Sequence, residues 1–436
     1  MALSLAIEII QLLRDRGHRG YLVGGCVRDR LLGGNPKDYD IATDARPDEI
    51  LRYFPEAGKV GAHFGVVLVR GGRGASVEVA TFRSDHSYSD GRRPDHVEFE
   101  ADPRQDVLRR DFTINALLED PLTGEIFDYV GGRQDLQKGI IRAIGDPIRR
   151  FGEDRLRMLR ALRFAARLGF EIDERTFAAI RQMAPLIHEI AAERVRDELM
   201  RILREGNPRR GFELLDRSNL LAEILPEVKA MQGVAQPPQF HPEGDVWTHT
   251  LLMLGRMTCP SPTLAMGVLL HDVGKPPTFR VAERIRFDGH VEAGVEIGAR
   301  ILERLKFSRD DSARILALIS NHMRFKDVQA MRESTLKRFL RLPQFDEHLE
   351  LHRLDCLASH GHLDNWEFVN QKRATLPAED IRPPRLLTGQ DLIAEGFQPG
   401  PAFGKALEEI ETAQLEGQIR TKEEALRIAR TMLTGA

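Results

Sequence analysis

Two aspartates, Asp38 and Asp40, stand two residues apart in the stretch Asn-Pro-Lys-Asp-Tyr-Asp-Ile-Ala-Thr (35–43). If this stretch is a β-strand, both carboxylates project to one face, while Tyr39 and Ile41 project to the other. Like charges at that distance are unfavourable unless a cation lies between them. A solvated strand edge would also tolerate the pair, so the neighbouring residues must be considered.

A Gly-Gly turn comes before these aspartates, with Gly25 thirteen residues ahead of Asp38. Gly24 and Gly25 end a strand-like run, and a helix with Arg28 in its first turn is expected to follow. Glycines let the backbone approach a phosphate, a helix N-terminus presents free N–H groups, and an arginine can hold phosphate oxygens. The order of turn, helix and paired aspartates indicates a triphosphate site beside a magnesium pair.

Residues 108–117, Leu-Arg-Arg-Asp-Phe-Thr-Ile-Asn-Ala-Leu, also carry groups suited to a nucleotide. Arg109 and Arg110 offer cationic forks for phosphates. Asp111 and Asn115 can bond a ribose hydroxyl, although Asp111 would serve equally well as a helix cap.

Residues 152–170 are expected to form a helix with one arginine face. At 100° per residue, four arginines lie within about a third of the circumference: Arg157, Arg160, Arg163 and Arg167. The run itself carries almost no acidic partners, so a solvated arginine face explains it less well than a binding surface. Asp154 and Arg157 offer acceptors and donors in fixed positions, as the edge of a base does.

In the C-terminal half, imidazoles and carboxylates lie on apolar segments that favour helices. They are His249, the pair His271-Asp272, His290, His322 and Asp355. One core histidine is usually structural, but this set is better explained by a bound metal. Imidazole and carboxylate ligands suit nickel, manganese, cobalt, iron or zinc. A degenerate domain that is only structural remains the alternative.

The elements that must position these groups change in type along the chain. Strand-like runs at 20–25, 38–43, 65–72, 76–82 and 125–132 alternate with turns and helical segments at 27–33 and 46–54, whereas helical patterns continue from about 146 to the C-terminus. The sequence thus predicts an α/β N-terminal domain followed by all-α domains. Pro-rich breaks at 233–244 and 376–385 help to set the predicted domains: 1–145, 146–235, 240–375 and 376–436.

The composition of the 436 residues narrows the class of protein. The net charge of −3 means that any polyanion site must be a local basic face. No apolar run approaches the roughly 20 residues of a membrane span, and residues 1–17 form an amphipathic helical pattern rather than a signal peptide. Three widely separated cysteines suggest no disulfide framework, and we expect a cytoplasmic protein.

Together, the N-terminal motifs resemble those of bacterial class II tRNA nucleotidyltransferases and poly(A) polymerases, in the polymerase-β-like superfamily. Residues 24–33 with 37–43 match the metal and triphosphate motif, 108–117 the phosphate and ribose motif, and 152–170 the base-reading motif. The resemblance implies that Asp154 and Arg157 replace a template in choosing CTP or ATP. It also places Arg160 and Arg163 at nucleotide-contacting positions.

The same resemblance assigns a function to residues 83–100, a long polar connection that we expect to be mobile. In the family this loop lets the site change from CTP to ATP specificity. Glu78, in the strand before it, is either a third metal-binding carboxylate or a plain strand acid.

The C-terminal set resembles the HD phosphohydrolase superfamily, whose order of His, His-Asp and Asp corresponds to His249, His271-Asp272 and Asp355. His290 and His322 match the extra ligands of its two-metal members. This implies a site for nickel, manganese, cobalt or a similar ion, distinct from the magnesium site.

The leading hypothesis is template-independent addition of C, C and A to tRNA 3′ ends from CTP and ATP, with release of pyrophosphate. An accessory 2′,3′-cyclic phosphodiesterase or phosphatase activity is expected in the HD domain. Alternatives are a poly(A) polymerase, a partial CC- or A-adding enzyme, and a tRNA-binding HD phosphohydrolase. A second-messenger synthetase-hydrolase is more distant, because such proteins carry their HD domain first.

Overall fold

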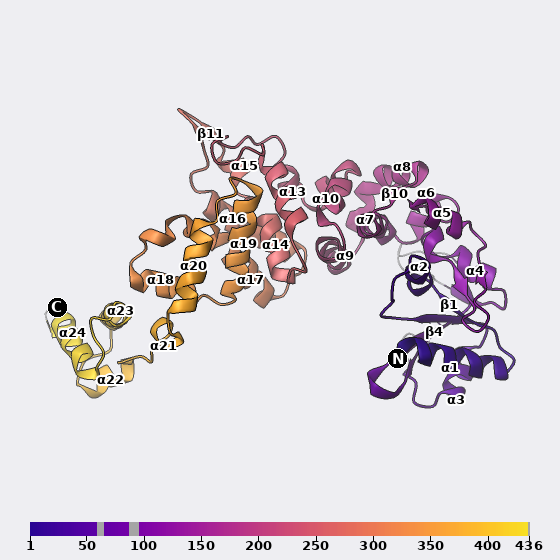
Figure 1. Cartoon of the computed structure of the whole chain (residues 1–436), viewed down its shortest axis with the longest axis horizontal. Helices are drawn as coiled ribbons and strands as arrows, with labels where there is room; N and C mark the ends of the chain where they lie inside the picture. Colours follow the sequence, from indigo (N-terminus) through magenta and orange to yellow (C-terminus); the bar gives the residue numbers. More distant parts are fainter. Residues whose placement is uncertain (59–64, 87–95, 435–436) are drawn as a thin grey trace. The chain divides into compact units, whose positions relative to one another are not determined.

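The computed structural model describes residues 1–58, 65–86 and 96–434. The chain, drawn from N- to C-terminus in Figure 1, forms two compact units. Unit 1 comprises Met1–Lys229 with Glu303–Phe307, and unit 2 comprises Ala230–Leu302 with Ser308–Ala436. The predicted boundary at 145 therefore lies inside unit 1.

Unit 1 begins with a six-stranded mixed sheet in the order β3-β4-β2-β1-β7-β8. The β2–β4 pair is parallel and the other pairs are antiparallel. The strands are β1 (Gly20–Val23), β2 (Asp40–Thr43), β3 (Val66–Arg70), β4 (Ser76–Thr81), β7 (Leu118–Glu119) and β8 (Ile126–Phe127). The helices of this region are α1 (Ala2–Asp15), α2 (Gly25–Leu31), α3 (Pro47–Tyr53), α4 (Pro103–Leu108) and α5 (Gly132–Lys138), with 3-10 turns η2 (Gly72–Gly74) and η3 (Thr113–Asn115).

The helical part of unit 1 follows the sheet directly. Its elements are α6 (Pro147–Glu153), α7 (Leu156–Leu168), α8 (Glu174–Met183), η4 (Ala184–Glu189), α9 (Ala192–Arg204), α10 (Pro208–Arg217), α11 (Leu220–Ile224) and α12 (Pro226–Lys229). Helix α7 packs against α9 and α10. Its apolar side is buried as expected, because Met158, Leu159, Ala161, Leu162 and Ala165 are each 0% exposed.

Unit 2 is almost entirely helical. Its helices are α13 (Val246–Arg256), α14 (Pro262–Leu270), α15 (Lys275–Thr278), α16 (His290–Arg304), α17 (Arg309–Asn321), η5 (His322–Ala330), α18 (Glu333–Leu340), α19 (Phe345–Ala358), α20 (Asp364–Thr375), α21 (Ala378–Ile381), α22 (Gly389–Ala394), α23 (Pro401–Leu415) and α24 (Lys422–Thr434). The last three helices share a small core of their own, which includes Leu392 and Ile410. The fold is thus an α/β domain followed by mostly helical domains.

Several predicted elements differ from the observed ones. The strand predicted from residue 38 begins at Asp40, because its partner β1 ends opposite, at Val23, where Gly24 turns with φ +80°. The ends of the predicted connection 83–100 form the antiparallel pair β5 (Arg83–His86) and β6 (His96–Phe99), while 87–95 lie outside the described residues. The connection therefore contains a strand at each end that was not predicted, while its mobility stays a prediction.

Short strands also occur where the sequence predicted none. β10 (Glu171–Ile172) pairs in parallel with β9 (Ile140–Ile141), and β11 (Arg280–Val281) pairs with β12 (Ile285–Arg286). Two-residue strands are too short to show an alternating apolar pattern, so the sequence could not reveal them.

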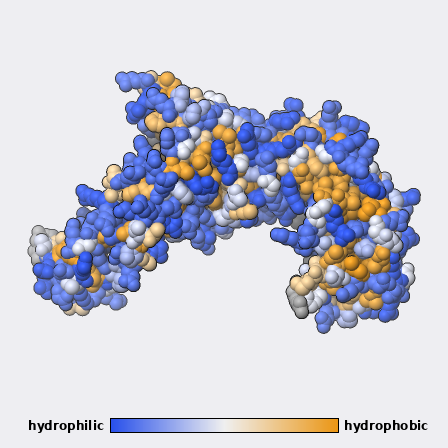
Figure 2. Space-filling view, in the orientation of Figure 1, coloured by the Kyte–Doolittle hydropathy of each residue, from blue (hydrophilic) through white to orange (hydrophobic). Residues whose placement is uncertain are grey.

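The surface carries both polar and apolar residues. Figure 2 shows hydrophilic residues over much of the visible face, interrupted by apolar areas. Every helix among the described residues is too short or too polar to cross a lipid bilayer.

Candidate active site and metal centre

The two aspartates of the opening motif lie at one end of the six-stranded sheet, where the interior strand β2 begins; we call this end of the strands the sheet edge. Asp40 begins β2 and Asp38 precedes it, and both are exposed. Between and after them, Tyr39 is 5% exposed and Ile41 is 0% exposed. The two acids therefore remain open to solvent while their neighbours join the core, as the alternating pattern predicts.

Glu78 is the direct neighbour of Asp40 on the adjacent strand. β2 and β4 run parallel, with Asp40 opposite Glu78 in the register, so the two side chains project from the same face. Partial desolvation, then the charges of Glu78 and Asp38, raise the pKa of Asp40 to about 6, although Arg110 opposes them. Asp40 is nonetheless exposed, so this desolvation comes from protein around an open edge. A divalent cation would relieve the repulsion.

The carboxylate oxygens at this edge lie farther apart than the ligand atoms of a complete metal site. Among the described residues, the groups of three or more ligand atoms within 4.8 Å of one another all lie in unit 2. The three acids of the sheet edge fit a metal held jointly with substrate phosphates, an arrangement typical of magnesium.

Arg110 lies against the Gly24 turn and is held there by Asp106. A Cβ added to Gly24 would lie 3.4 Å from Arg110 Nη1, an ordinary contact, so the φ of +80° rather than lack of space favours glycine here. Arg110 donates to Asp106 Oδ2 from Nε (3.2 Å) and Nη2 (3.0 Å). Arg109 donates to the other oxygen, Oδ1, from Nε (2.9 Å) and Nη2 (2.6 Å). A single buried carboxylate, 1% exposed, thus orients both arginines.

Arg28 occupies a different environment from the one expected of a phosphate ligand. It is 2% exposed. Its Nη1 donates to Asn115 Oδ1 at 2.6 Å and its Nε donates to Asp29 Oδ1 at 2.7 Å. Its guanidinium also lies 5.1 Å from the centre of the Phe164 ring. In this structure Arg28 joins α2 to Asn115 rather than facing an open cradle.

Asp111 and Asn115 are brought together, as their spacing suggested. Asn115 donates to Asp111 Oδ1 at 3.2 Å, while Arg160 donates to Asp111 Oδ2 from Nε (2.9 Å) and Nη2 (2.6 Å). Burial alone would raise the pKa of Asp111, but Arg160, Arg157 and Asn115 together lower that pKa to about 2. Asp111 is therefore a fixed anion that already has a cationic partner.

The other α7 arginines also have acidic partners, so the expectation that this face lacks them is wrong. Arg157 pairs with Glu153 at 2.7 Å, Arg163 with Glu198 at 2.8 Å, and Arg167 with Asp29 at 3.1 Å. Apart from Glu153, the partners come from elements distant in sequence, which is why the run itself looked unpaired. Arg163, only 4% exposed, contributes to the packing of α7 on α9.

Asp154 and Arg157 flank the junction between α6 and α7 but bond to different groups. Asp154 accepts two hydrogen bonds from Arg194 of α9, from Nη1 to Oδ1 at 3.2 Å and from Nη2 to Oδ2 at 3.0 Å. Arg157 donates from Nη2 to the carbonyl oxygen of Arg109 at 3.0 Å. The α9 arginine therefore orients the proposed base-reading acid, a contact that the sequence motif did not reveal.

In unit 2, the structure gathers all six predicted metal-binding residues into two adjoining groups. His249, His271 and Asp355 form the first, and each offers a ligand atom within 4.8 Å of the others. Asp272, His290 and His322 form the second, by the same measure. Five elements or their ends supply them: α13, the end of α14, the start of α16, the end of α17, and α19.

The imidazole rings are fixed in the orientation that a metal needs. The Nδ1 atoms of His271, His290 and His322 lie 2.7–2.9 Å from backbone carbonyl oxygens of Val268, Phe287 and Ile319, respectively. His249 Nδ1 lies 2.7 Å from Glu243 Oε1. A donor Nδ1–H leaves the Nε2 lone pair available for a metal.

The Nε2 atoms show that this donor set fits a metal. His249 Nε2 and His271 Nε2 are buried and have no hydrogen-bond partner among the described residues. They lie 3.1 Å from carboxylate oxygens of Asp355 and Asp272, respectively. Burial would raise the pKa of Asp272, but His271 and Lys275 hold that pKa well below its usual range. Two buried imidazole–carboxylate groups of this kind suit a transition metal.

Gly274 permits this arrangement. A Cβ at residue 274 would lie 2.0 Å from the His290 carbonyl oxygen and 2.5 Å from the Gly294 amide nitrogen. Only glycine allows the His271-Asp272 segment to approach the start of α16 this closely.

Four contributors were not predicted from the sequence: Asp106, Arg194, Glu243 and Lys275. Lys275 is 7% exposed, and its Nζ lies 2.6 Å from Asp272 Oδ2 and 2.7 Å from Gln236 Oε1. The sequence His-Asp-Val-Gly-Lys could have revealed this contact. Lys275 stands three residues after Asp272, and side chains three residues apart lie close together on a helical turn.

Three protein-family models match successive parts of the chain. A family model for the poly A polymerase head domain matches residues 20–142, one for the probable RNA and SrmB-binding site of polymerase A matches 169–232, and one for the HD domain matches 245–356. The CCA-adding enzyme of Limosilactobacillus reuteri is 32% identical over 418 residues, which cover 95% of this chain and 93% of that protein. The chain belongs to the CCA-adding enzyme family.

Other members agree with this assignment. The CCA-adding enzyme of Streptococcus pneumoniae is 31% identical over 97% of this chain and 95% of its own length. The match to the Lactobacillus helveticus enzyme, at 41% identity, spans 57% of this chain and 63% of that protein. The crystal structure of the Bacillus stearothermophilus CCA-adding enzyme in complex with CTP superposes with a TM-score of 0.75 at 27% identity, covering 99% and 98% of the two chains.

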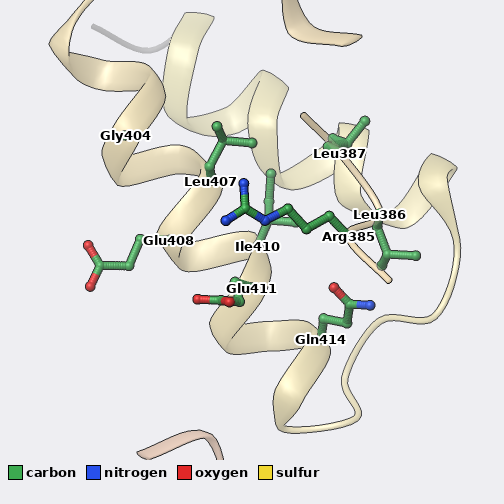
Figure 3. A pocket seen from close by; sticks show the side chains of 9 residues that line it. All are labelled: Arg385, Leu386, Leu387, Gly404, Leu407, Glu408, Ile410, Glu411 and Gln414. Atoms are coloured by element: carbon green, nitrogen blue, oxygen red, sulfur yellow. The ribbon is translucent and has the colours of Figure 1, made fainter. Parts of the chain in front are cut away.

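One pocket lies apart from both sites, in the C-terminal helices of unit 2. It has a volume of about 230 Å³ and is lined by α23 and residues 385–387. Figure 3 shows Arg385 extending across it above Ile410. Glu411, on its wall, is engaged by Arg338 and Arg341.

Proposed function

We propose that this chain adds C, C and A to the 3′ end of tRNA from CTP and ATP, and releases pyrophosphate. The observation that carries the proposal is the register of β2 with β4, which sets Asp40 beside Glu78, with Asp38 exposed next to them. Bound magnesium would activate the RNA 3′-hydroxyl and stabilise the leaving pyrophosphate. A tRNA substrate implies a cytoplasmic place of action.

The chain's own residues would bind and orient the nucleotide around this edge. Arg110, held by Asp106, points its guanidinium at the Gly24-Gly25 turn, where a triphosphate would lie. Asp111 would accept from the ribose hydroxyl once Arg160 shifts, and Asp154 and Arg157 would select the base. Arg28, Asn115 and Arg163 would support these groups through buried contacts.

The deciding experiment uses tRNA that ends at the bare discriminator base. Incubation with CTP and ATP, resolved at single-nucleotide length, should give three added residues and then stop. Two additions would indicate a CC-adding enzyme and a long ladder a poly(A) polymerase. A single A added only to a second tRNA that already ends in CC would indicate an A-adding enzyme. The proposal fails if RNA of unchanged length is the only product.

The base-reading assignment has its own test. Asp154→Ala should relax the choice among the four ribonucleotides more than it weakens triphosphate binding, because one edge contact contributes roughly 1–3 kcal/mol. Uniformly slower incorporation with unchanged selectivity would instead make Asp154 structural, through its bond to Arg194.

We propose a second activity for the HD domain: hydrolysis of a phosphate monoester or a 2′,3′-cyclic phosphate with nickel, manganese or cobalt bound. It is favoured by the two ligand groups and by the orphaned Nε2 atoms of His249 and His271. His271→Ala should abolish phosphate release and leave CCA addition intact, whereas His362→Ala, an exposed imidazole elsewhere in unit 2, should change neither. Wild-type protein that releases no phosphate with any of these ions or with magnesium would make the HD domain structural.

A further inference from the structure

The β11–β12 hairpin is anchored on the second metal group at both of its ends. On one side, Lys275 donates to Asp272 at 2.6 Å, and its Nζ lies 5.4 Å from the centre of the Phe287 ring. On the other, the carbonyl oxygen of Phe287 lies 2.9 Å from His290 Nδ1 and also accepts from the His290 backbone N–H. Figure 1 shows the hairpin projecting from the helices of unit 2 near α15.

A second segment, residues 236–243, approaches the other metal group. Gln236 bonds to Lys275, and Glu243 lies 2.8 Å from His241 and 2.7 Å from His249. The loop that carries Phe240 is thereby tied to the ligands of both groups. We call this loop together with the hairpin the HD rim.

Exposed aromatic rings are concentrated on the HD rim. Among the phenylalanines, tyrosines and tryptophans of the described residues, three side chains are exposed: Tyr129, Phe240 and Phe279. Phe240 is 56% exposed and Phe279 is 38% exposed, and both belong to the rim. Exposed rings beside a catalytic group are typical platforms on which the bases of single-stranded nucleic acid stack.

The hairpin also carries two arginines that form no ion pair with a described residue, with one exposed acid, Glu283, in the turn between the strands. Arg280 and Arg284 are exposed, and neither side chain has a hydrogen bond or ion pair with any described residue. Arg280 stands directly opposite Arg286 across the hairpin, and only Arg286 is neutralised, by Asp288. Like charges facing each other across two strands are unfavourable unless an anion lies between them.

From these contacts we propose that the HD rim binds single-stranded RNA, with Phe240 and Phe279 stacking on bases and Arg280 and Arg284 pairing with phosphates. The substrate class of the HD site is then a phosphate at the end of an RNA strand rather than a free nucleotide. This second statement rests on the hydrolytic function proposed above; the binding of RNA does not.

The kinetic test compares two substrates of the full-length protein: a short single-stranded RNA ending in a 2′,3′-cyclic phosphate, and 2′,3′-cyclic AMP. Phe279→Ala should lower kcat/KM for the RNA at least about fivefold, from the stacking lost, and leave the mononucleotide within about twofold. Arg280→Gln with Arg284→Gln should lower the salt dependence of RNA binding by a slope of about 1.4. Arg300→Gln, an exposed α16 arginine, is the matched control and should change neither.

A crosslinking test separates the two claims. A photoreactive phenylalanine analogue at position 279 should crosslink to a labelled RNA oligonucleotide, while the same analogue at Phe403, in α23, should not. If crosslinking occurs without phosphate release, the hydrolytic function fails and the RNA-binding rim stands. If phosphate is released but the RNA does not crosslink, or if the rim variants affect both substrates equally, the rim proposal is wrong.

Discussion

The two candidate metal sites of this chain differ in the exposure of their ligand residues and in the partners those residues already have. At the sheet edge, Asp38 and Asp40 are exposed, and the arginines expected to meet a nucleotide already pair with internal acids such as Asp106 and Asp111. In the HD domain, His249 and His271 are almost fully buried and their Nε2 atoms have no hydrogen-bond partner among the described residues.

This difference shows how each site relates to its ligand. A nucleotide at the sheet edge must compete with protein carboxylates, so Arg160 has to exchange Asp111 for another partner. A metal in the HD domain meets ligands whose rings are already fixed, so little except proton loss has to precede its binding. Nucleotide binding at the sheet edge thus requires arginines to change partners, whereas metal binding in the HD domain uses side chains that are already in place.

The largest expected effect separates the two sites completely. Asp40→Asn should reduce addition of both C and A by about 1000-fold or more, because a metal-binding charge is lost where negative charge develops in the transition state. Phosphate release by the HD domain should be unchanged, as measured on the same preparation. Asp48→Asn removes an exposed acid from α3 and should affect neither activity. Near-normal addition by Asp40→Asn would refute the assignment.

The pH dependence of metal binding should differ between the sites. Asp40, with a pKa of about 6, is ionised above that pH, so magnesium affinity should be flat from pH 7 to 9 and weaken about fivefold from pH 6 to 5. Burial would lower the pKa of His249, but Asp355 and Glu243 raise it to about 9, with Asp272 also contributing. His249 must lose that proton to bind a metal, so HD affinity should rise on the order of 50-fold from pH 7 to 9.

Each site can be measured alone in this comparison. Asp40→Asn protein reports the HD metal, and His271→Ala protein reports magnesium at the sheet edge, both by titration against a chelator. The ring of His249 also contacts the rings of His271 and His241, so the HD profile is read as that of the whole group. Equal pH profiles for the two sites would contradict the proposed difference.

Glu243 should matter for metal affinity although it comes from outside the predicted set. Glu243→Gln keeps an oxygen near His249 Nδ1 but removes the charge that makes the imidazole a better ligand. We expect metal affinity to fall at least about tenfold at a fixed pH. Glu296→Gln, an exposed acid on α16, should leave affinity unchanged. An unaltered affinity in Glu243→Gln would show that His249 needs no such partner.

The sequence predicted the groups that perform chemistry better than the groups that hold them. The six HD ligands stand in recognisable motifs on apolar helices, and the structure gathers them. Asp106 and Arg194 could not be assigned in this way, because their partners depend on how α4 and α9 pack. Helix α7 shows the converse error: its arginines looked unpaired because Glu198 and Asp29 lie far away in sequence.

The fold followed the same rule. Strands rich in β-branched residues, such as β3 and β4, were predicted within two residues of their ends. The side-by-side placement of Asp40 and Glu78 depends on β2 pairing in parallel with β4, which no local pattern contains. The sequence alone therefore predicted most of the longer strands and helices, but not the register or the long-range pairing of the strands.

The smallest expected effect concerns Asp106. Its carboxylate accepts hydrogen bonds from Arg109 and Arg110 at the sheet edge, as Glu243 orients His249 in the HD domain. Burial would raise the pKa of Asp106, but Arg109 and Arg110 lower it, so the side chain is an anion at neutral pH. Asp106→Asn should loosen both guanidinium groups and raise KM for CTP and ATP alike by about fivefold, with a smaller change in kcat.

Asp102→Asn is the matched control, because it removes the same charge from the same helix while an asparagine still caps α4. A merely structural Asp106 would lower the unfolding temperature and the amount of active protein without changing KM. If Asp106→Asn binds both nucleotides normally, Arg109 and Arg110 do not meet the triphosphate, and the sheet edge is less preorganised than its geometry indicates.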